Sequence, residues 1–304
     1  MTEPAITVEH LEKRYGELVA VRDVTFEVRR GEIFGILGPN GSGKTTTVEC
    51  LQGLRRADGG TLRVLGLDPT RQADQLRRRI GAQLQDSALP DRIRVGEALE
   101  LFSSLSPGGP PWPTVLDEWG LGDKRRASFA DLSGGKRQRL FIALALVNAP
   151  EVVFLDEMTT GLDPSARRVA WSLVDRLRET GTTVVLVTHF MDEAEHLCDR
   201  VCVIDDQRVV AAGTPAELVA ASRGAGDVTF TTSEDVGFLA GARGVTEVRR
   251  SGRKVTVQGS GPLLAHVAAA LVAHGIAPLD LDAHRASLED VYLELTGDEH
   301  GNGR

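Results

Sequence analysis

The sequence is poor in cysteine and in long apolar runs, and each shortage excludes a class of protein. Its 304 residues include three cysteines, which are too few for a disulfide framework. Cys198 and Cys202 lack the CxxC spacing of a metal or redox motif, and His196 beside them is weak evidence for a metal. Idle or buried thiols in a reducing compartment are the better interpretation. The longest apolar run, Leu140–Val147, is far shorter than the ~20 residues that span a bilayer.

Positive charge is also in short supply. The chain has 35 Lys and Arg against 43 Asp and Glu, a net charge of −8. Binding to nucleic acid irrespective of sequence requires cations that neutralise phosphates, so we expect no nucleic-acid partner. The N-terminal residues 1–6 contain neither the basic nor the apolar region of a signal peptide. We therefore expect a globular chain that does not cross a membrane by itself.

The most specific feature that is present is a glycine-rich loop between an apolar, strand-like run and a helical stretch. The run is Ile33–Leu37, and the loop reads Gly38, four residues, Gly43, Lys44 and Thr45, which fits the phosphate-binding P-loop pattern. Glycines let successive backbone N–H groups converge on one anion at a helix N-terminus. The alternative, a turn without function, is disfavoured by the position of Gly-Lys-Thr between strand and helix.

This loop predicts how a nucleotide is held. Lys44 can reach the β- and γ-phosphates, and the Thr45 hydroxyl can take a Mg²⁺ coordination position. The loop residues expected to bind the nucleotide are Gly38, Pro39, Asn40, Gly41, Ser42, Gly43, Lys44, Thr45 and Thr46. We expect the helix that follows to run from Lys44 to about Leu54.

Polar residues follow two further strands. Residues 151–157 predict a strand that ends in two carboxylates, and its four consecutive apolar residues suit a strand buried on both faces of a parallel sheet. The carboxyl end of such a strand is where open α/β sheets bind ligands. Asp156 there can hold Mg²⁺ through its water shell, and Glu157 can orient and polarise the attacking water. The alternative is a solvated strand end. His189 follows the apolar run 182–188 at the same edge, which favours a γ-phosphate contact over a structural histidine.

Three more positions are candidates for binding or for helix starts. Ser133, Gly134 and Gly135 precede an apolar helix, and a capping serine with free N–H groups makes a second anion site. Such a site either serves the same ligand or is offered to a partner. Tyr15 can stack on a nucleobase, with an ordinary strand-end aromatic as the alternative. Asp163 precedes a proline and is expected to be the N-cap of another helix.

The order of elements predicts separate parts of the chain. Residues 5–30 alternate like short antiparallel strands, and residues 95–149 are mostly helical with an irregular break at 106–113. Residues 225–296 alternate like strands and then contain an amphipathic helix, the apolar segment 276–281 and a helix from Ser287. We interpret them as a small α/β sandwich.

Together these residues resemble the ATP-binding subunit of an ABC transporter over residues 5–220. The matching motifs are Tyr15 as the adenine-stacking aromatic, Walker A at Gly38–Thr46, Gln85 in the Q-loop, the signature Leu132–Lys136, Walker B at Val152–Asp156 with Glu157, the D-loop at Asp163 and His189 as the switch histidine. Several motifs in register are far more specific than any one of them. GTPases lack the Leu-Ser-Gly-Gly element, and the sequence contains no Asn-Lys-x-Asp guanine reader.

The resemblance implies roles for these residues. Catalysis would use Glu157, His189, Lys44 and Gln85, and Gln85 would join Thr45 and Asp156 at the metal. The residues implied to contact the nucleotide beyond the P-loop are Tyr15, Ser133, Gly134, Gly135 and Asp163. The implied cofactors are ATP and Mg²⁺.

The implied fold is α/β: a P-loop NTPase (ABC ATPase) core with an antiparallel β subdomain and a helical subdomain, plus a small C-terminal α/β domain. We expect the ATP-binding domain at residues 1–222, with its helical subdomain at about 93–149. The accessory domain is expected at 225–297, followed by a disordered tail at 298–304.

The implied partners are a separate transmembrane permease and a second copy of the chain in an ATP-sandwich homodimer. The chain would then be cytoplasmic, peripheral on the inner face of the cell membrane through the permease. The segment Ser287–Gly297 is similar to the C-terminal extension of daunorubicin-resistance-type (ABC-2) exporter ATPases. It favours export of a drug, an antibiotic or a lipid-like molecule.

Two departures from the family pattern and two alternatives remain. Lys136 stands where Gln is common, and Met158 where Pro usually follows the glutamate; both lie beside the chemistry, so they concern its rate. One alternative is a soluble ABC-type ATPase acting as a mechanical or regulatory module, although such relatives usually carry a coiled coil, a hinge or a second ATPase. The other, a scaffold that binds nucleotide without hydrolysis, is disfavoured by Glu157 and His189.

Overall fold

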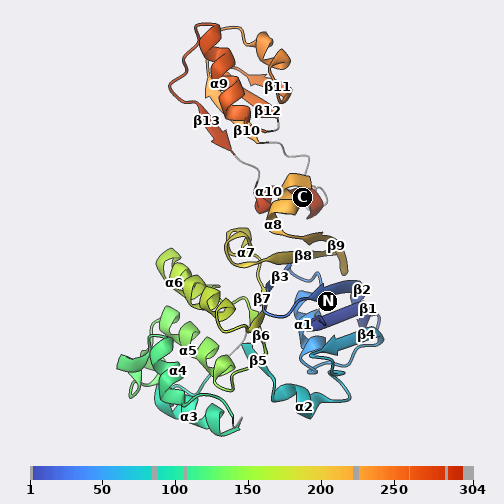
Figure 1. Cartoon of the computed structure of the whole chain (residues 1–304), viewed down its shortest axis with the longest axis vertical. Coiled ribbons are helices and arrows are strands. Elements are labelled where there is room, and N and C mark those ends of the chain that lie inside the picture. Colours follow the sequence, from blue (N-terminus) through green and yellow to red (C-terminus); the bar gives the residue numbers. More distant parts are fainter. Residues whose placement is uncertain are drawn as a thin grey trace. The chain divides into compact units, whose positions relative to one another are not determined.

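The structure is a computed structural model that describes residues 3–83, 88–105, 108–221, 226–259, 261–284 and 287–296 (Figure 1). It divides into two compact units, Met1–Pro215 and Ala216–Arg304, which are described separately below. The predicted domain limits at residues 222 and 225 stay a prediction, because the segment 222–225 lies outside the described residues. The predicted tail at 298–304 lies outside them as well.

The first unit is built on one mixed sheet. In the described part of the chain its strand order is β4-β1-β2-β9-β8-β3-β7-β6-β5. The strands are β1 (Ile6–Tyr15), β2 (Leu18–Val28), β3 (Ile33–Leu37), β4 (Gly59–Val64), β5 (Ile80–Gln83), β6 (Val152–Asp156), β7 (Thr183–Val187), β8 (Arg200–Asp205) and β9 (Arg208–Gly213). Parallel pairing joins β8, β3, β7, β6 and β5, and antiparallel pairing joins β4, β1 and β2.

Three of the parallel strands are buried along their whole length. Every residue of β3, β6 and β7 is buried, as the apolar runs in the sequence predict for strands covered on both faces. Ile36 of β3 and Asp156 of β6 both pair with Val187 of β7. The carboxyl ends of the three strands therefore lie at the same height along one edge of the sheet.

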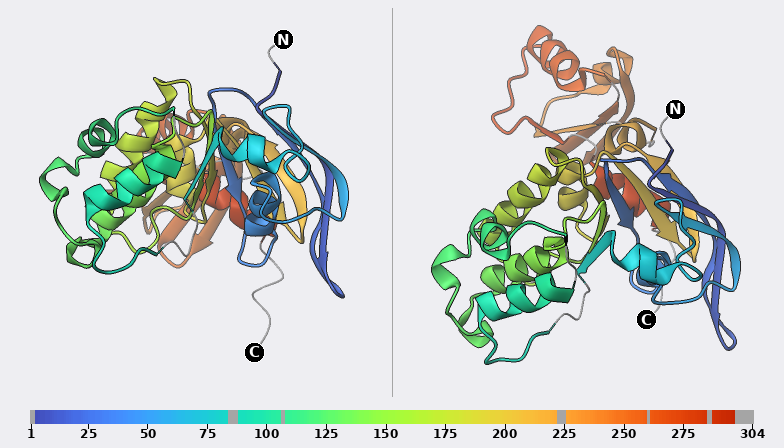
Figure 2. Two further views of the ribbon diagram at one scale, coloured as in Figure 1. Left: turned by 90° about the horizontal axis from the view of Figure 1, so that it is seen from below. Right: turned by 60° about the horizontal axis from the view of Figure 1, so that its bottom comes forward.

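Helices cover this sheet and form a separate helical part. They are α1 (Lys44–Leu51), α2 (Ala73–Arg77), α3 (Val95–Leu105), α4 (Trp112–Glu118), α5 (Gly134–Leu146), α6 (Pro164–Asp175) and α7 (Met191–Leu197). Helix α8 (Pro215–Ala221) starts at the last residue of this unit and otherwise belongs to the second unit. In Figures 1 and 2 the green helices α3, α4 and α5 lie on one side of the central strands, and the blue strands β1 and β2 lie on the other. No helix in the described ranges is long and apolar enough to cross a membrane.

Three local predictions are corrected by the structure. The strands expected to be short in residues 5–30 form one long hairpin, with 10 residues in β1 and 11 in β2. Helix α1 ends at Leu51 rather than near Leu54, because Gly53 has a left-handed φ of 71°, which stops a helix. The irregular break expected through Pro113 ends earlier, since α4 begins at Trp112 with Pro113 in its first turn, where proline costs no hydrogen bond.

The second unit contains an antiparallel sheet covered by a helix. Its described strands are β10 (Asp227–Thr231), β11 (Val245–Ser251), β12 (Lys254–Gly259) and β13 (Asp282–His284), in the order β11-β12-β10-β13. Inward residues of the sheet such as Val228 and Val257 form one core with Val267 and Leu271 of α9 (Leu263–Ala273). The last described helix, α10 (Leu288–Thr296), starts after Ser287, whose hydroxyl donates to the Asp290 carboxylate at 2.7 Å.

Candidate nucleotide site

The P-loop connects β3 to α1 at the carboxyl edge of the parallel strands. Gly38 and Gly43 have φ angles of 153° and 102°, in the left-handed region that favours glycine. A Cβ atom at Gly38 would lie 2.1 Å from the carbonyl oxygen of Ile204. A Cβ atom at Gly43 would lie 2.5 Å from the carbonyl oxygen of Ala20. Neither position has room for a side chain, so the two glycines fix the shape of the loop.

Lys44 is buried beneath this loop. Only 5% of the residue is exposed, and its Nζ donates hydrogen bonds to the carbonyl oxygens of Gly38 at 2.8 Å and Pro39 at 2.9 Å. Burial lowers the pKa of Lys44, and the negative charges of Glu157 and Asp156 oppose that shift. The ammonium group is thus held where an anion seated in the loop would meet it.

Asp156 ends β6 as a buried carboxylate with unused acceptor capacity. It is 3% exposed, and its Oδ1 has no hydrogen-bond partner among the described residues. The pKa of Asp156 is raised to about 6, chiefly by burial and also by the negative charge of the neighbouring Glu157, while the positive charge of Lys44 partly opposes the shift. An orphaned carboxylate oxygen beside the P-loop suits a hard cation or its bound water, because oxygen ligands are those that Mg²⁺ prefers.

Glu157 and His189 face each other across neighbouring strand ends. Glu157 has a left-handed φ of 47°, and its backbone N–H donates to the Val187 carbonyl at 2.9 Å. The side chain of Glu157 is 11% exposed and that of His189 is 39% exposed. Glu157 Oε1 lies 3.3 Å from His189 Nδ1. A carboxylate and an imidazole in contact beside a phosphate cradle are the groups that orient and deprotonate a water molecule.

One cavity of about 660 Å³ is lined by half of the predicted site residues. It is lined by Tyr15, Asn40, Gly41, Gly43, Lys44, Thr45, Thr46, Glu157 and His189, together with Leu18, Val19, Ala20, Thr160 and Gln207. Tyr15 is 41% exposed, and the Nζ of Lys13 lies 5.2 Å from the centroid of its ring. Tyr15 therefore lines the same cavity as the P-loop, and its stacking on a nucleobase stays a prediction.

Sequence reasoning missed Thr160 and Gln207 on this cavity. Thr160 Oγ1 lies 3.5 Å from Glu157 Oε2, and the threonine run directly after the two carboxylates was the available signal. Gln207 lies in the turn between β8 and β9 with a φ of 61°, and Arg22 donates to its Oε1 at 3.4 Å. No feature of the sequence near Gln207 indicates that this turn reaches the cavity.

The signature segment belongs to a different place in the fold. Ser133 occupies the N-cap position of α5 as predicted, but its hydroxyl makes no capping hydrogen bond, which corrects the expected role of that side chain. A Cβ atom at Gly135 would lie 3.1 Å from Cβ of Ala166, so the glycine lets α5 approach α6 closely. In the described part of the chain, Ser133, Gly134 and Gly135 are absent from the lining of the P-loop cavity.

The remaining candidates are Asp163 and Gln85. Asp163 is the N-cap of α6, as predicted, and its Oδ1 accepts from the backbone N–H groups of Ser165 at 2.9 Å and Ala166 at 3.0 Å. It is also absent from the lining of the cavity at the P-loop. Gln85 lies outside the described residues, so its predicted contact with a metal stays a prediction.

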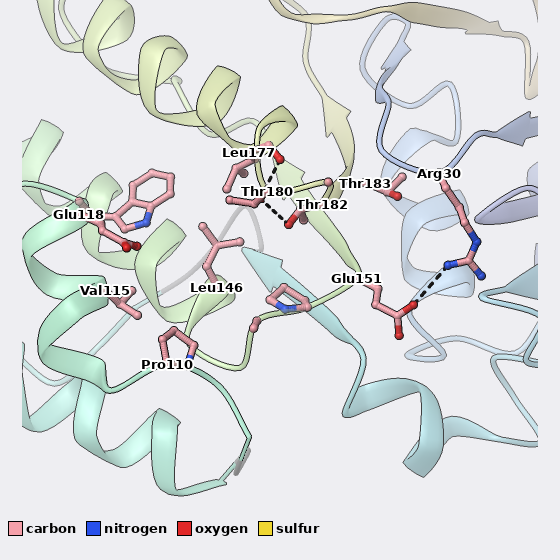
Figure 3. Close-up of a pocket in the computed structure, with 14 residues that line it drawn as sticks. Arg30, Pro110, Val115, Glu118, Leu146, Glu151, Leu177, Thr180, Thr182 and Thr183 are labelled. Atoms are coloured by element: carbon pink, nitrogen blue, oxygen red, sulfur yellow. Dashed lines mark hydrogen bonds and ion pairs between the residues drawn. The ribbon is translucent and has the colours of Figure 1, made fainter.

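A second cavity, of about 400 Å³, lies at the opposite, amino ends of β6 and β7 (Figure 3). Its walls include Val115, Leu146 and Leu177, with Glu151 and Arg30 forming an ion pair at 3.3 Å on one side. No residue of the predicted site lines it. The candidate site is therefore the P-loop cavity.

The fold and the P-loop cavity define a P-loop nucleotide-binding protein. A family model described as "ABC transporter" matches residues 21–160. The chain is 40% identical to the Nod factor export ATP-binding protein I of Ralstonia nicotianae, over 97% of this chain and 95% of that protein. It is also 40% identical to a daunorubicin resistance ATP-binding protein of Streptomyces coeruleorubidus, over 98% of each chain. The chain belongs to the family of ABC transporter ATP-binding proteins.

A solved structure supports the same assignment. The chain is similar to a bacterial ABC transporter cassette whose dimeric structure has been solved, with a TM-score of 0.62 and 28% sequence identity. The match covers 69% of this chain and 98% of the cassette. The predicted fold class, an ABC ATPase core, is confirmed, and so is the predicted ATPase family. The sequence relatives match nearly the whole chain, so they share its C-terminal unit as well.

The buried carboxyl of Asp156 predicts a pH dependence of stability. Its pKa is about 6 in the folded chain and near 4 when unfolded, so the folded state holds a proton between these values that the unfolded state releases. Stability is therefore lost as pH rises from about 4 to about 6, by on the order of 3 kcal/mol. Asp156→Asn removes this loss, so the free energy of unfolding of the variant should rise relative to that of the wild type as the pH goes from about 4 to about 6.

The measurement is urea unfolding of both proteins from pH 4 to pH 8, without nucleotide or divalent cations. Comparing the two chains cancels the titration of the other carboxyl groups. Parallel pH profiles for wild type and variant would contradict the assigned pKa.

Proposed function

We propose that this chain is the ATP-hydrolysing subunit of an exporter, and that two copies bind and hydrolyse ATP to drive a separate membrane permease. One observation carries the proposal. Lys44, Glu157 and His189 line a single cavity at the sheet edge, with the buried Asp156 beside Lys44, while the signature residues lie elsewhere. Such a site contains the groups needed for hydrolysis but not the signature residues.

The phosphates would be held by the P-loop. Backbone N–H groups of Gly41, Gly43 and the first turn of α1 supply hydrogen bonds, and Lys44 exchanges its two carbonyl contacts for phosphate oxygens. Thr45 and Asp156 would hold Mg²⁺, with Gln85 as a third group by family resemblance. When bound, Mg²⁺ would neutralise the charge that develops on the phosphates.

The attacking water would be prepared by Glu157. Its carboxylate lines the same cavity as the P-loop and can accept the proton of a water aimed at the γ-phosphate. His189, 3.3 Å from Glu157 Oε1, would hold that carboxylate in place and contact the γ-phosphate. Tyr15, which also lines the cavity, would stack on the adenine ring.

Two substitutions separate binding from chemistry. Glu157→Gln should keep ATP affinity and lower turnover by about 10²–10⁴-fold, because it removes a base and leaves the phosphate contacts intact. Lys44→Ala should weaken ATP binding itself, because it removes the cation that the loop holds against the phosphates. Both effects can be measured as ATP affinity and steady-state hydrolysis of the purified full-length chain.

Glu179→Gln is the matched control, since it makes the same change at an exposed glutamate after α6. It should leave both quantities unchanged. A Glu157→Gln protein that turns over ATP at the wild-type rate would eliminate Glu157 as the base.

A second copy of the chain would supply the signature residues that this site lacks. Ser133 and Gly135 lie at the N-terminus of α5, where the first N–H groups of a helix lack an acceptor within the helix, yet these residues do not line the described P-loop cavity of their own chain. A head-to-tail dimer, as the family resemblance implies, would bring the signature of each copy to the P-loop of the other. Because this chain carries both halves, two identical copies would form two complete sites.

Mixing two inactive variants tests this arrangement. Lys44→Ala destroys the P-loop, and Ser133→Arg blocks the signature. In a mixed dimer one site contains both lesions and the other contains none, so part of the activity should return on mixing. If each signature served its own chain, mixing would restore nothing.

Differently tagged variants allow the control. Capture through one tag and detection of the other shows that mixed dimers have formed. Hydrolysis is then measured on the captured dimers alone. Captured mixed dimers without activity would refute a site shared between two chains.

We also propose that the chain works on the inner face of the cell membrane, bound to its permease. The names of its relatives, Nod factor export and daunorubicin resistance, favour export, with a drug, an antibiotic or a lipid-like molecule as cargo. A soluble mechanical or regulatory ATPase is the second candidate, but the names of these relatives do not support it.

Co-purification distinguishes the two candidates. A tagged chain from detergent-solubilised membranes should bring down a polytopic membrane protein in about equal amount. The signal should survive Glu157→Gln, because that change leaves binding surfaces intact. Recovery of the chain without any polytopic partner, from membranes and cytosol alike, would favour the soluble alternative.

A further inference from the structure

Outside the groups that would touch ATP, the first unit contains a fully buried carboxylate on α7. Glu193 is 0% exposed. Its Oε1 accepts hydrogen bonds from Thr159 Oγ1 at 2.8 Å and from Trp171 Nε1 at 2.9 Å. Its Oε2 has no hydrogen-bond partner among the described residues. A buried carboxylate that binds two donors through one oxygen and leaves the other unpaired is costly for a merely structural role.

The two donors come from separate segments. Thr159, itself 1% exposed, lies in the turn after β6, and Trp171 lies on α6. The Oε1 atom of Glu193 on α7 therefore links the turn after β6 to helices α6 and α7. A residue of the proposed site lies in or next to each of these three segments.

The first segment leads to Glu157. The turn is closed by hydrogen bonds from the Thr160 N–H to the Glu157 carbonyl at 3.1 Å and from the Leu162 N–H to the Thr159 carbonyl at 3.1 Å. Glu157 and Thr159 are thus parts of one short, hydrogen-bonded loop. Displacement of Thr159 would move the carboxylate of Glu157.

The other two segments lead to Asp163 and His189. Asp163 caps the helix that carries Trp171, and His189 precedes the helix that carries Glu193. Arg167 of α6 adds a second contact between these helices through its ion pair with Asp192 at 2.7 Å. Its guanidinium also lies 4.4 Å from the ring centroid of Phe190, the residue after His189.

We propose that Glu193 is a positioning residue that fixes Glu157 relative to His189 and to Asp163 at the start of α6. It touches neither nucleotide nor water and acts through Thr159 and Trp171. The inference rests on the proposed function, because it assumes that Glu157 prepares the attacking water. Positioning of this kind matters because a reacting group displaced by about 1 Å can cost on the order of 10²-fold in rate.

Four substitutions test the proposal in the full-length chain. Thr159→Val and Trp171→Phe each remove one donor and keep the shape of the side chain. Glu193→Leu removes the acceptor at similar volume, while Glu193→Gln keeps an acceptor oxygen. Ser172→Ala, at an exposed position of α6 beside Trp171, is the control.

The expected result is a loss of kcat with ATP affinity preserved. Thr159→Val and Trp171→Phe should each lower kcat by about 10-fold, and Glu193→Leu by up to about 100-fold. Glu193→Gln should retain most of the wild-type kcat. Thermal unfolding of each variant is measured alongside, because an apolar replacement of a buried charge need not destabilise a protein.

Two outcomes would overturn the inference. If Glu193→Leu, Thr159→Val and Trp171→Phe change the melting temperature and leave kcat per folded molecule as in wild type, the network is structural only. If Glu157→Gln also keeps full turnover, the proposed function fails together with the inference. If the wild type hydrolyses ATP and Glu157→Gln does not, the proposed function stands, and unchanged kcat in the other variants then refutes only the role of Glu193.

Discussion

Parallel pairing of three buried strands is the constraint on which the site depends. Because β3, β7 and β6 run in one direction and in register, the groups that follow them emerge at one edge. The P-loop follows β3 and the His189 segment follows β7, while Asp156 ends β6 and Glu157 comes directly after it. A shift of one residue in any of these pairings would turn its side chains to the other face of the sheet. The apolar composition of the strands resists such a shift, since it would bring polar end residues into the core.

The electrostatics of the site follow from the same burial. Lys44 and Asp156 are both nearly inaccessible, and burial pushes each toward its neutral form. Their opposite charges partly offset that effect, so neither group is fully compensated by the other. The proposed ATP–Mg²⁺ complex would bring negative phosphate to Lys44 and positive charge to Asp156 at the same time. Each component would then offset a charge that burial leaves unfavourable in the protein alone.

The sequence predicts the parts of this structure that depend on local chemistry. The P-loop glycines and the N-cap at Asp163 have strong signals, because a left-handed backbone or a helix start accepts few residue types. The buried strands are equally clear in the apolar runs. The helix start at Trp112 was missed since prolines on both sides read as a break, although one of them is compatible with a first helical turn. Tertiary contacts such as that of Gln207 with the cavity carry no local signal at all.

The order of strands in the central sheet also bears on how the chain folds. β3 lies between β7 and β8, so that Phe34 pairs with Val185 on one side and Arg200 on the other. The strand that supports the P-loop is made early in synthesis, but its two neighbours emerge only when most of the first unit has left the ribosome. This high contact order predicts slow folding and a period in which apolar β3 is exposed as an unpaired edge. The P-loop therefore reaches its final support only after β7 and β8 are made, so nucleotide should bind only to a nearly complete first unit.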